Sequence, residues 1–113
     1  MPHLVIEYSS ELESHTKVSA MMQAAHDAAV ESRLFGVDDI KVRAYGCGHS
    51  LVGGRAASSV HITVYLLSGR DQPTQKALAE TVLTHMKKLR LPLQSLSVDC
   101  RDMDRSVYTK EIY

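Results

Sequence analysis

Four stretches of the chain alternate between hydrophobic and polar positions with the period of two that is typical of β-strands. In the first stretch, Leu4, Ile6 and Tyr8 point one way and their neighbours the other. The pattern predicts strands over residues 2–8, 39–46, 60–67 and 94–101. The third stretch is β-branched and almost entirely apolar, so we expect it near the centre of a sheet.

Two longer stretches repeat their hydrophobic residues every three or four positions, as one face of an α-helix does. They predict helices over residues 14–34 and 72–90. Asp71 is a suitable N-cap for the second helix, and Pro92 is expected to end it. The predicted buried faces consist of Val18, Met21, Met22, Ala25 and Ala29 in the first helix and Leu78, Val82, Met86 and Leu89 in the second.

These elements occur in the order strand, helix, strand, and the order is repeated. Two parallel strands need a crossover connection, and each half of the chain supplies a helix for it. We therefore predict a single α+β domain over residues 1–113, in which βαβ pseudo-repeats at about 2–45 and 58–101 form a four-stranded sheet with both helices on one face. The glycine- and serine-rich segment 46–59 is expected to be a long loop or an irregular hairpin.

The sheet face away from the helices would carry several apolar residues. Val5, Tyr45, Tyr65 and Leu67 make this face too apolar for open water. Packing against copies of the same chain would cover it, so we expect a cyclic homo-oligomer. The polar tail, residues 102–113, is expected either to fray or to dock on a neighbouring subunit.

Composition narrows the class of partner. The chain has 13 basic and 13 acidic residues and a formal net charge of zero, which argues against nucleic acid or an anionic membrane as its main partner. No stretch approaches the roughly 18 apolar residues of a membrane span. The N-terminus does not resemble a signal peptide, so we expect a cytoplasmic protein whose two cysteines, Cys47 and Cys100, are reduced.

The first residues are the clearest candidates for chemistry. Removal of Met1 would leave Pro2 with a free secondary amine fixed at the start of a strand, although many proteins begin Met-Pro and the dipeptide alone is weak evidence. Lys41 and Arg43 share one face of the second predicted strand, and Arg70 follows the third. Burial and nearby cations would lower the pKa of the Pro2 amine and leave it free to carry a proton. Guanidinium groups would hold the carboxylates of a substrate.

These residues also have structural interpretations. Lys41 and Arg43 would serve equally as a solvated strand face, and Arg70 would serve as a partner of Asp71. The six histidines lack metal-ligand spacing on a helix, and the segment Cys47-Gly48-His49 is only a weak metal motif. The glycines do not form a phosphate-binding motif. We therefore predict neither a metal nor a cofactor.

Several short segments together indicate a family. Met1-Pro2-His3 leads into a strand ending at Glu7, and the later segments are Ile40-Lys41-Val42-Arg43-Ala44, Ser68-Gly69-Arg70 and Leu96-Ser97-Val98-Asp99. In these segments the chain resembles, nearly from end to end, the 5-carboxymethyl-2-hydroxymuconate isomerases of the tautomerase superfamily. The resemblance implies a fold like that of macrophage migration inhibitory factor, assembled as a homotrimer.

The resemblance also implies a reaction. Pro2 would act as general base and acid and move a proton in a dienol dicarboxylate or tricarboxylate, in the degradation of 4-hydroxyphenylacetate (homoprotocatechuate), without cofactor or metal. Arg70 matches the family's arginine after the third strand. The family's second-strand arginine falls on Lys41 in the simplest register, with Arg43 two residues on, so both are candidates for gripping a carboxylate. The alternatives are another activity of this fold, such as keto–enol tautomerisation of an aryl pyruvate, and a non-catalytic trimeric binding protein.

Overall fold

The computed structural model describes all residues from 1 to 113 and contains two α-helices and six β-strands. The two helices are α1 (Val18–Ser32) and α2 (Gln72–Lys87). The strands of the main sheet are β1 (His3–Ser9), β2 (Lys41–Cys47), β5 (Ser59–Leu67) and β6 (Ser95–Met103). A small hairpin of β3 (Leu51–Val52) and β4 (Arg55–Ala56) lies between the two halves of the chain.

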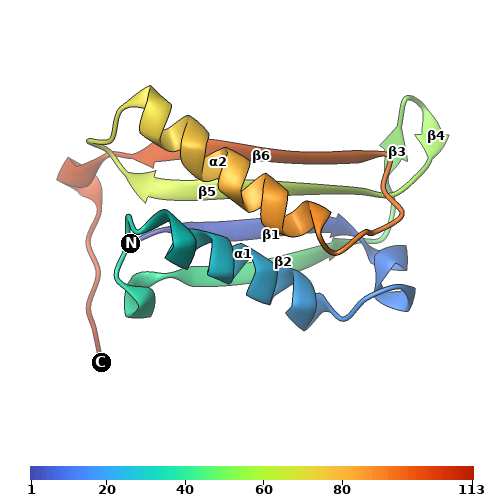
Figure 1. The fold of residues 1–113 in the computed structure, drawn as a ribbon, viewed down its shortest axis with the longest axis horizontal. Coiled ribbons are helices and arrows are strands. Elements are labelled where there is room, and N and C mark those ends of the chain that lie inside the picture. Colours follow the sequence, from blue (N-terminus) through green and yellow to red (C-terminus); the bar gives the residue numbers. More distant parts are fainter.

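The main sheet has the strand order β2-β1-β5-β6. Strand β1 is parallel to β2, and β5 is parallel to β6, whereas the two central strands, β1 and β5, are antiparallel. Each parallel pair is joined through one helix, and both helices cover the same face of the sheet (Figure 1). The predicted pair of βαβ units in a four-stranded sheet is therefore confirmed.

The core lies between the helices and this face. Alternate residues of the two central strands are fully buried there, which confirms the predicted alternation and the central place of β5. The corresponding residues of β2 and β6 are only half-buried, because these strands form the edges of the sheet. The buried hydrophobic residues of these strands and helices are Leu4, Ile6 and Tyr8 of β1, Val60, Ile62, Val64 and Leu66 of β5, Met21, Ala25, Ala28 and Ala29 of α1, and Leu78, Val82 and Met86 of α2.

The boundaries of the first helix differ from the prediction. Residues Ser10–Ser14 form a separate 3₁₀ turn, and α1 begins only at Val18. The turn buries Leu12 completely, so a hydrophobic residue that fits no helical stripe closes one end of the core. The second helix also ends earlier than predicted, at Lys87, although Asp71 caps it as expected by accepting a hydrogen bond from the Thr74 backbone N–H at 2.9 Å.

The segment 46–59 contains the short β3–β4 hairpin, which projects beyond the end of the main sheet (Figure 1). Gly53 and Gly54 form its tip with φ values of 59° and 77°. Two consecutive residues with positive φ are what a tight hairpin turn of the primed type requires, and glycine adopts them without steric cost.

The first part of the C-terminal tail contacts its own chain, which the sequence analysis did not predict. Strand β6 continues to Met103, and a 3₁₀ turn (Arg105–Val107) then redirects the chain. The tail crosses the start of β1 of its own chain (Figure 1), where Tyr108 contacts His3 and Lys110 pairs with Asp39. These contacts are tertiary and leave no periodic signal in the sequence, whereas docking of the tail on a neighbouring subunit stays a prediction.

Neither helix combines the length with the apolar character that crossing a bilayer would require.

Candidate active site

The strand directions bring the N-terminus and the three predicted cations, Lys41, Arg43 and Arg70, to one end of the sheet. Strands β1 and β2 both begin there, with His3 opposite Lys41. Strand β5 ends there, because His3 also lies opposite Tyr65 in the antiparallel pair. Leu67 ends β5, and Arg70 follows three residues later, close enough to the Met1 amine to lower its pKa. We call this end of the sheet, around Pro2, the Pro2 end.

Pro2 is held firmly at this end. Its side chain is buried, and its carbonyl oxygen accepts a hydrogen bond from the Lys41 backbone N–H at 3.1 Å. The chain still carries Met1, so the Pro2 nitrogen is a peptide nitrogen in this structure. A basic amine at Pro2 requires the removal of Met1.

The amine of Met1 shows how charges act at this end. Burial is the main cause that lowers its pKa below the usual 8.0. Asp39 opposes this shift, whereas Lys110, Lys41 and Arg70 reinforce it. Together these effects favour a neutral amine.

Arg70 connects the end of β5 to the end of α1. Its Nη2 donates a hydrogen bond of 2.8 Å to the Leu34 carbonyl oxygen, and its guanidinium carbon lies 5.0 Å from the centroid of the Phe35 ring. Asp71, its expected partner in the structural interpretation, instead caps α2. Arg70 forms no ion pair, so its remaining N–H groups can hold an anion.

Lys41 and Arg43 point away from the helices, as the alternation predicts, and neither forms an ion pair. The Lys41 ammonium donates to the Asp39 carbonyl oxygen at 3.1 Å and lies 3.8 Å from the Met1 sulfur. The Arg43 guanidinium lies 3.2 Å from Nδ1 of His3. Lys41 is thus adjacent to the N-terminus, whereas Arg43 contacts it through His3.

Four residues at the Pro2 end were not singled out from the sequence. Nε2 of His3 is 3.2 Å from the hydroxyl of Tyr108, and that hydroxyl lies 3.0 Å from the Met1 sulfur. Lys110 and Asp39 form an ion pair at 2.8 Å. Burial, followed by Arg43, Lys41 and the N-terminal amine, lowers the pKa of His3 below 6.5. Only the proximity of His3 to Pro2 in the sequence could have suggested its place.

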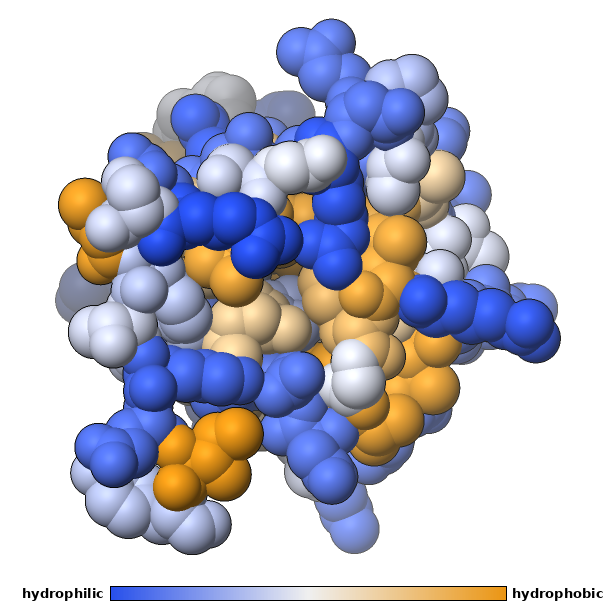
Figure 2. Space-filling model, turned by 90° about the vertical axis from the view of Figure 1, so that its left-hand side faces the viewer, coloured by the Kyte–Doolittle hydropathy of each residue, from blue (hydrophilic) through white to orange (hydrophobic).

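The surface at this end suits a ligand with both carboxylate and apolar parts. Figure 2 views the molecule from the Pro2 end and shows long hydrophilic side chains around a more hydrophobic central area. No group of three or more His, Cys, Asp or Glu side chains is placed to hold a metal ion.

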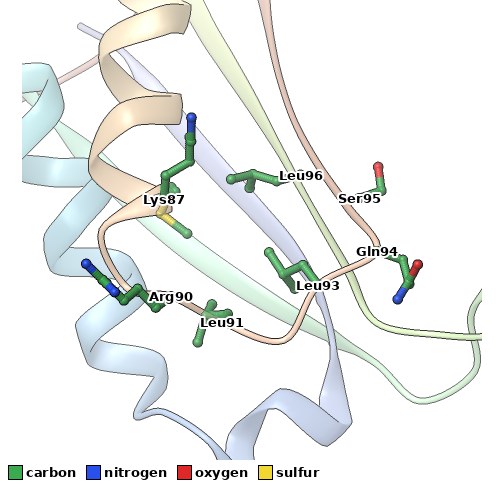
Figure 3. A pocket seen from close by; sticks show the side chains of 8 residues that line it. Lys87, Arg90, Leu91, Leu93, Gln94, Ser95 and Leu96 are labelled. Atoms are coloured by element: carbon green, nitrogen blue, oxygen red, sulfur yellow. The ribbon is translucent and has the colours of Figure 1, made fainter.

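A separate surface pocket of about 250 Å³ lies at the opposite end of the sheet, between the end of α2 and the start of β6 (Figure 3). It contains two cationic side chains, but no carboxylate, imidazole or α-amine that could act as a base. The Pro2 end is therefore a better candidate for chemistry than this pocket. The pocket is lined by Met86, Lys87, Arg90, Leu91, Leu93, Gln94, Ser95 and Leu96.

Solved structures share this fold over nearly the whole chain. A 5-carboxymethyl-2-hydroxymuconate delta-isomerase superposes with a TM-score of 0.80 at 21% identity, covering 100% of this chain and 89% of the other. A 5-carboxymethyl-2-hydroxymuconate isomerase from Deinococcus radiodurans R1 gives 0.75 at 21% identity, covering 97% and 88%. A fused 4-OT, solved as an asymmetric trimer, gives 0.73 at 16% identity, covering 96% and 91%. No curated protein matches the sequence.

The chain therefore has the fold of these solved structures. A family model for 5-carboxymethyl-2-hydroxymuconate isomerase matches residues 2–111. The chain belongs to the 5-carboxymethyl-2-hydroxymuconate isomerase family, and the protein is an isomerase.

Proposed function

We propose that the protein, once Met1 is removed, moves a proton within a dienol that carries two or three carboxylates, and that 5-carboxymethyl-2-hydroxymuconate is its substrate. Pro2 acts as the base and then as the acid, and Arg70, Lys41 and Arg43 bind carboxylates. The observation that supports this function best is a strand-anchored Pro2 at an end of the sheet where these three cations lack carboxylate partners.

The environment suits a neutral amine. Burial, Lys110, Lys41 and Arg70 lower the pKa of the Met1 amine, which precedes the Pro2 nitrogen by one residue. The same effects favour an uncharged Pro2 amine after processing. An amine that titrates near the working pH is an efficient proton carrier.

The reaction is balanced without an added reagent. The proton of the enol hydroxyl passes to the Pro2 nitrogen, and the electrons of the O–H bond form a carbonyl as the diene shifts. The far carbon of the diene then takes the proton back from the Pro2 ammonium. Between these steps the substrate is a dienolate, and Arg70 and Lys41 stabilise its negative charge.

We also propose that the protein assembles as a homotrimer. On the sheet face away from the helices, Tyr45 and Tyr65 are 56% and 38% exposed in the single chain, and contact with copies would cover them. Sedimentation should give three times the 12.5 kDa mass of the protomer. A monomer at assay concentrations would contradict this assembly.

The catalytic proposal is tested by following the ultraviolet absorbance of the dienol during turnover. Intact mass first verifies that Met1 is absent. Replacing Pro2 with Ala should lower kcat by about 100-fold or more, within the range of general base catalysis. Pro92→Ala, in the connection after α2, is the matched control and should retain activity.

Equal rates for wild type and Pro2→Ala would remove Pro2 from the mechanism. A parallel assay with an aryl pyruvate distinguishes the proposed substrate from a keto–enol tautomerase activity. No turnover of either compound by the processed protein would favour a binding protein.

A further inference from the structure

The C-terminal tail brings an aromatic hydroxyl to the Pro2 end. Tyr108 is half-buried, whereas its neighbours in the tail are exposed. Its hydroxyl lies 3.2 Å from Nε2 of His3 and 3.0 Å from the Met1 sulfur. The Lys110–Asp39 ion pair at 2.8 Å fixes the tail two residues further on. Tyr108 thus contacts the one residue whose removal exposes the Pro2 amine.

The donors and acceptors in the chain of hydrogen bonds from Arg43 through His3 to Tyr108 can be assigned in only one way. A guanidinium can only donate, so Arg43 makes Nδ1 of His3 an acceptor at 3.2 Å. The neutral ring then carries its proton on Nε2, which donates to the Tyr108 oxygen. The Tyr108 O–H is left to donate, and in the structure it donates to the Met1 sulfur. The phenol proton therefore points into the volume that Met1 occupies.

We propose that Tyr108 is a catalytic residue, which donates this hydrogen bond to the oxygen of the dienolate formed beside Pro2 when Met1 is gone. The inference rests on the proposed function, because it assigns a donor to the negative charge that Pro2 creates. Tyr108 keeps its proton throughout, and proton transfer remains with Pro2. His3 is a positioning residue that acts through Tyr108.

Two features make this hydroxyl a suitable donor. Its oxygen already accepts from His3, and hydrogen bonds in such a chain polarise one another in the same direction. The guanidinium of Arg43 begins the chain, so its charge draws electron density away from the phenol. A fixed donor aimed at the site of developing charge stabilises the intermediate without reorganisation. Burial and Arg43 lower the pKa of His3, which maintains the neutral ring that this direction requires.

The tail offers a matched control for the test. Tyr113 is in the same tail, is fully exposed and makes no hydrogen bond. In protein whose intact mass shows the loss of Met1, Tyr108→Phe should lower kcat by about 10- to 100-fold and change KM by less than about threefold. Tyr113→Phe should leave both constants and the Tm unchanged, and Tyr108→Phe should lower the Tm by no more than about 6 °C, because it loses one hydrogen bond with His3.

The positioning role of His3 is tested by a double-mutant cycle. His3→Asn retains an acceptor for Arg43 but is too short to donate to Tyr108. It should lower kcat about as much as Tyr108→Phe, and the double variant should show no further loss, because both changes remove one donor chain. Additive losses would overturn the role given to His3.

A binding measurement separates this proposal from the proposed function. The probe is 4-hydroxybenzene-1,3-dicarboxylate, a planar and unreactive compound with an enol-like hydroxyl beside a carboxylate. By calorimetry, Tyr108→Phe should raise its Kd by about three- to tenfold, as expected for one hydrogen bond, and Tyr113→Phe should not. Equal kcat and Kd for these two variants would overturn the role of Tyr108, even if Pro2→Ala is inactive. Weaker binding by Tyr108→Phe alone, in a protein that does not turn over the dienol, would support Tyr108 as a ligand donor and refute the proposed function.

Discussion

Replacing Arg70 should reduce stability as well as activity, because this residue joins two parts of the fold. The change Arg70→Ala removes the 2.8 Å hydrogen bond to the Leu34 carbonyl oxygen at the end of α1. It also removes a cation from the face of Phe35, which lies 5.0 Å away. The carboxylate grip and the connection between β5 and α1 would then be lost together.

The expected size follows from these two contacts. A hydrogen bond from a charged donor contributes about 1.5–3 kcal/mol, and a partly exposed cation–π contact about 0.5–1 kcal/mol. Because Arg70 is only half-buried, we take the lower ends and expect a loss of about 2 kcal/mol. For a domain of this size, that corresponds to a fall in Tm of about 8 °C. Arg70→Lys keeps the charge but not the planar fork, and should lose about half as much.

Thermal and denaturant unfolding, both at one protomer concentration, measure this loss without a contribution from changed assembly. Arg55→Ala is the control, since the Arg55 side chain lies exposed on the β3–β4 hairpin and makes no hydrogen bond. A Tm for Arg70→Ala within about 1 °C of that of Arg55→Ala would refute the reasoning, because the two contacts would then contribute nothing measurable.

Three further predictions concern single positions. Gly46→Ala should lower the free energy of unfolding, measured by denaturant titration, by about 1–2 kcal/mol. The added Cβ would lie 3.1 Å from the Tyr8 hydroxyl oxygen, which cannot easily move because it donates to Glu13 at 2.6 Å. Gly48→Ala is the control, because its Cβ would have no neighbour within 4 Å. Asp71→Ala should lower the Tm at neutral pH, because the helix α2 loses its N-cap. The hydrogen bond from Thr74 lowers the pKa of Asp71 below 3.8. The difference in Tm between wild type and variant should therefore persist above pH 3.8 and vanish as the pH falls through the pKa of the folded state. Iodoacetamide at mildly alkaline pH should modify Cys47 and spare Cys100. Burial, with Asp99 and Asp102, raises the pKa of Cys100 to about 11, so its thiol stays protonated. Equal labelling of the two cysteines in a peptide mass map would contradict this prediction.

The regular elements could be predicted because their signals are local. The alternation of Leu4, Ile6 and Tyr8 reports a strand with one buried face, and the structure buries those three residues. Asp71 reports a helix start because its side chain needs only the backbone three residues on. Such features depend on neighbours in the sequence and change little with the rest of the fold.

Contacts between distant segments could not be predicted in this way. Tyr108 contacts His3, 105 positions earlier in the chain, and no periodicity or motif in the tail predicts this contact. Leu12 was missed for a related reason, since a single buried residue in a 3₁₀ turn belongs to no stripe. Lys41, Arg43 and Arg70 could be proposed as a group because they lie on or just after predicted strands and because the family resemblance assigns them to carboxylate binding.

The site's asymmetry explains why a duplicated fold offers only one candidate centre. In the second βαβ unit, β5 begins at Ser59, so Ser58 occupies the place that Pro2 has before β1. Ser58 lies within the chain and has no amine to expose. Its hydroxyl donates to Glu11 at 2.8 Å, and Glu11 follows β1 much as Arg70 follows β5. The opposite end of the sheet thus has an acidic residue where the Pro2 end has a basic one, and a carboxylate there would repel an anionic substrate. Reversing this charge with Glu11→Arg would still supply no base there. Assayed with the dienol, the double variant Glu11→Arg/Pro2→Ala should therefore have a kcat no higher than that of Pro2→Ala alone.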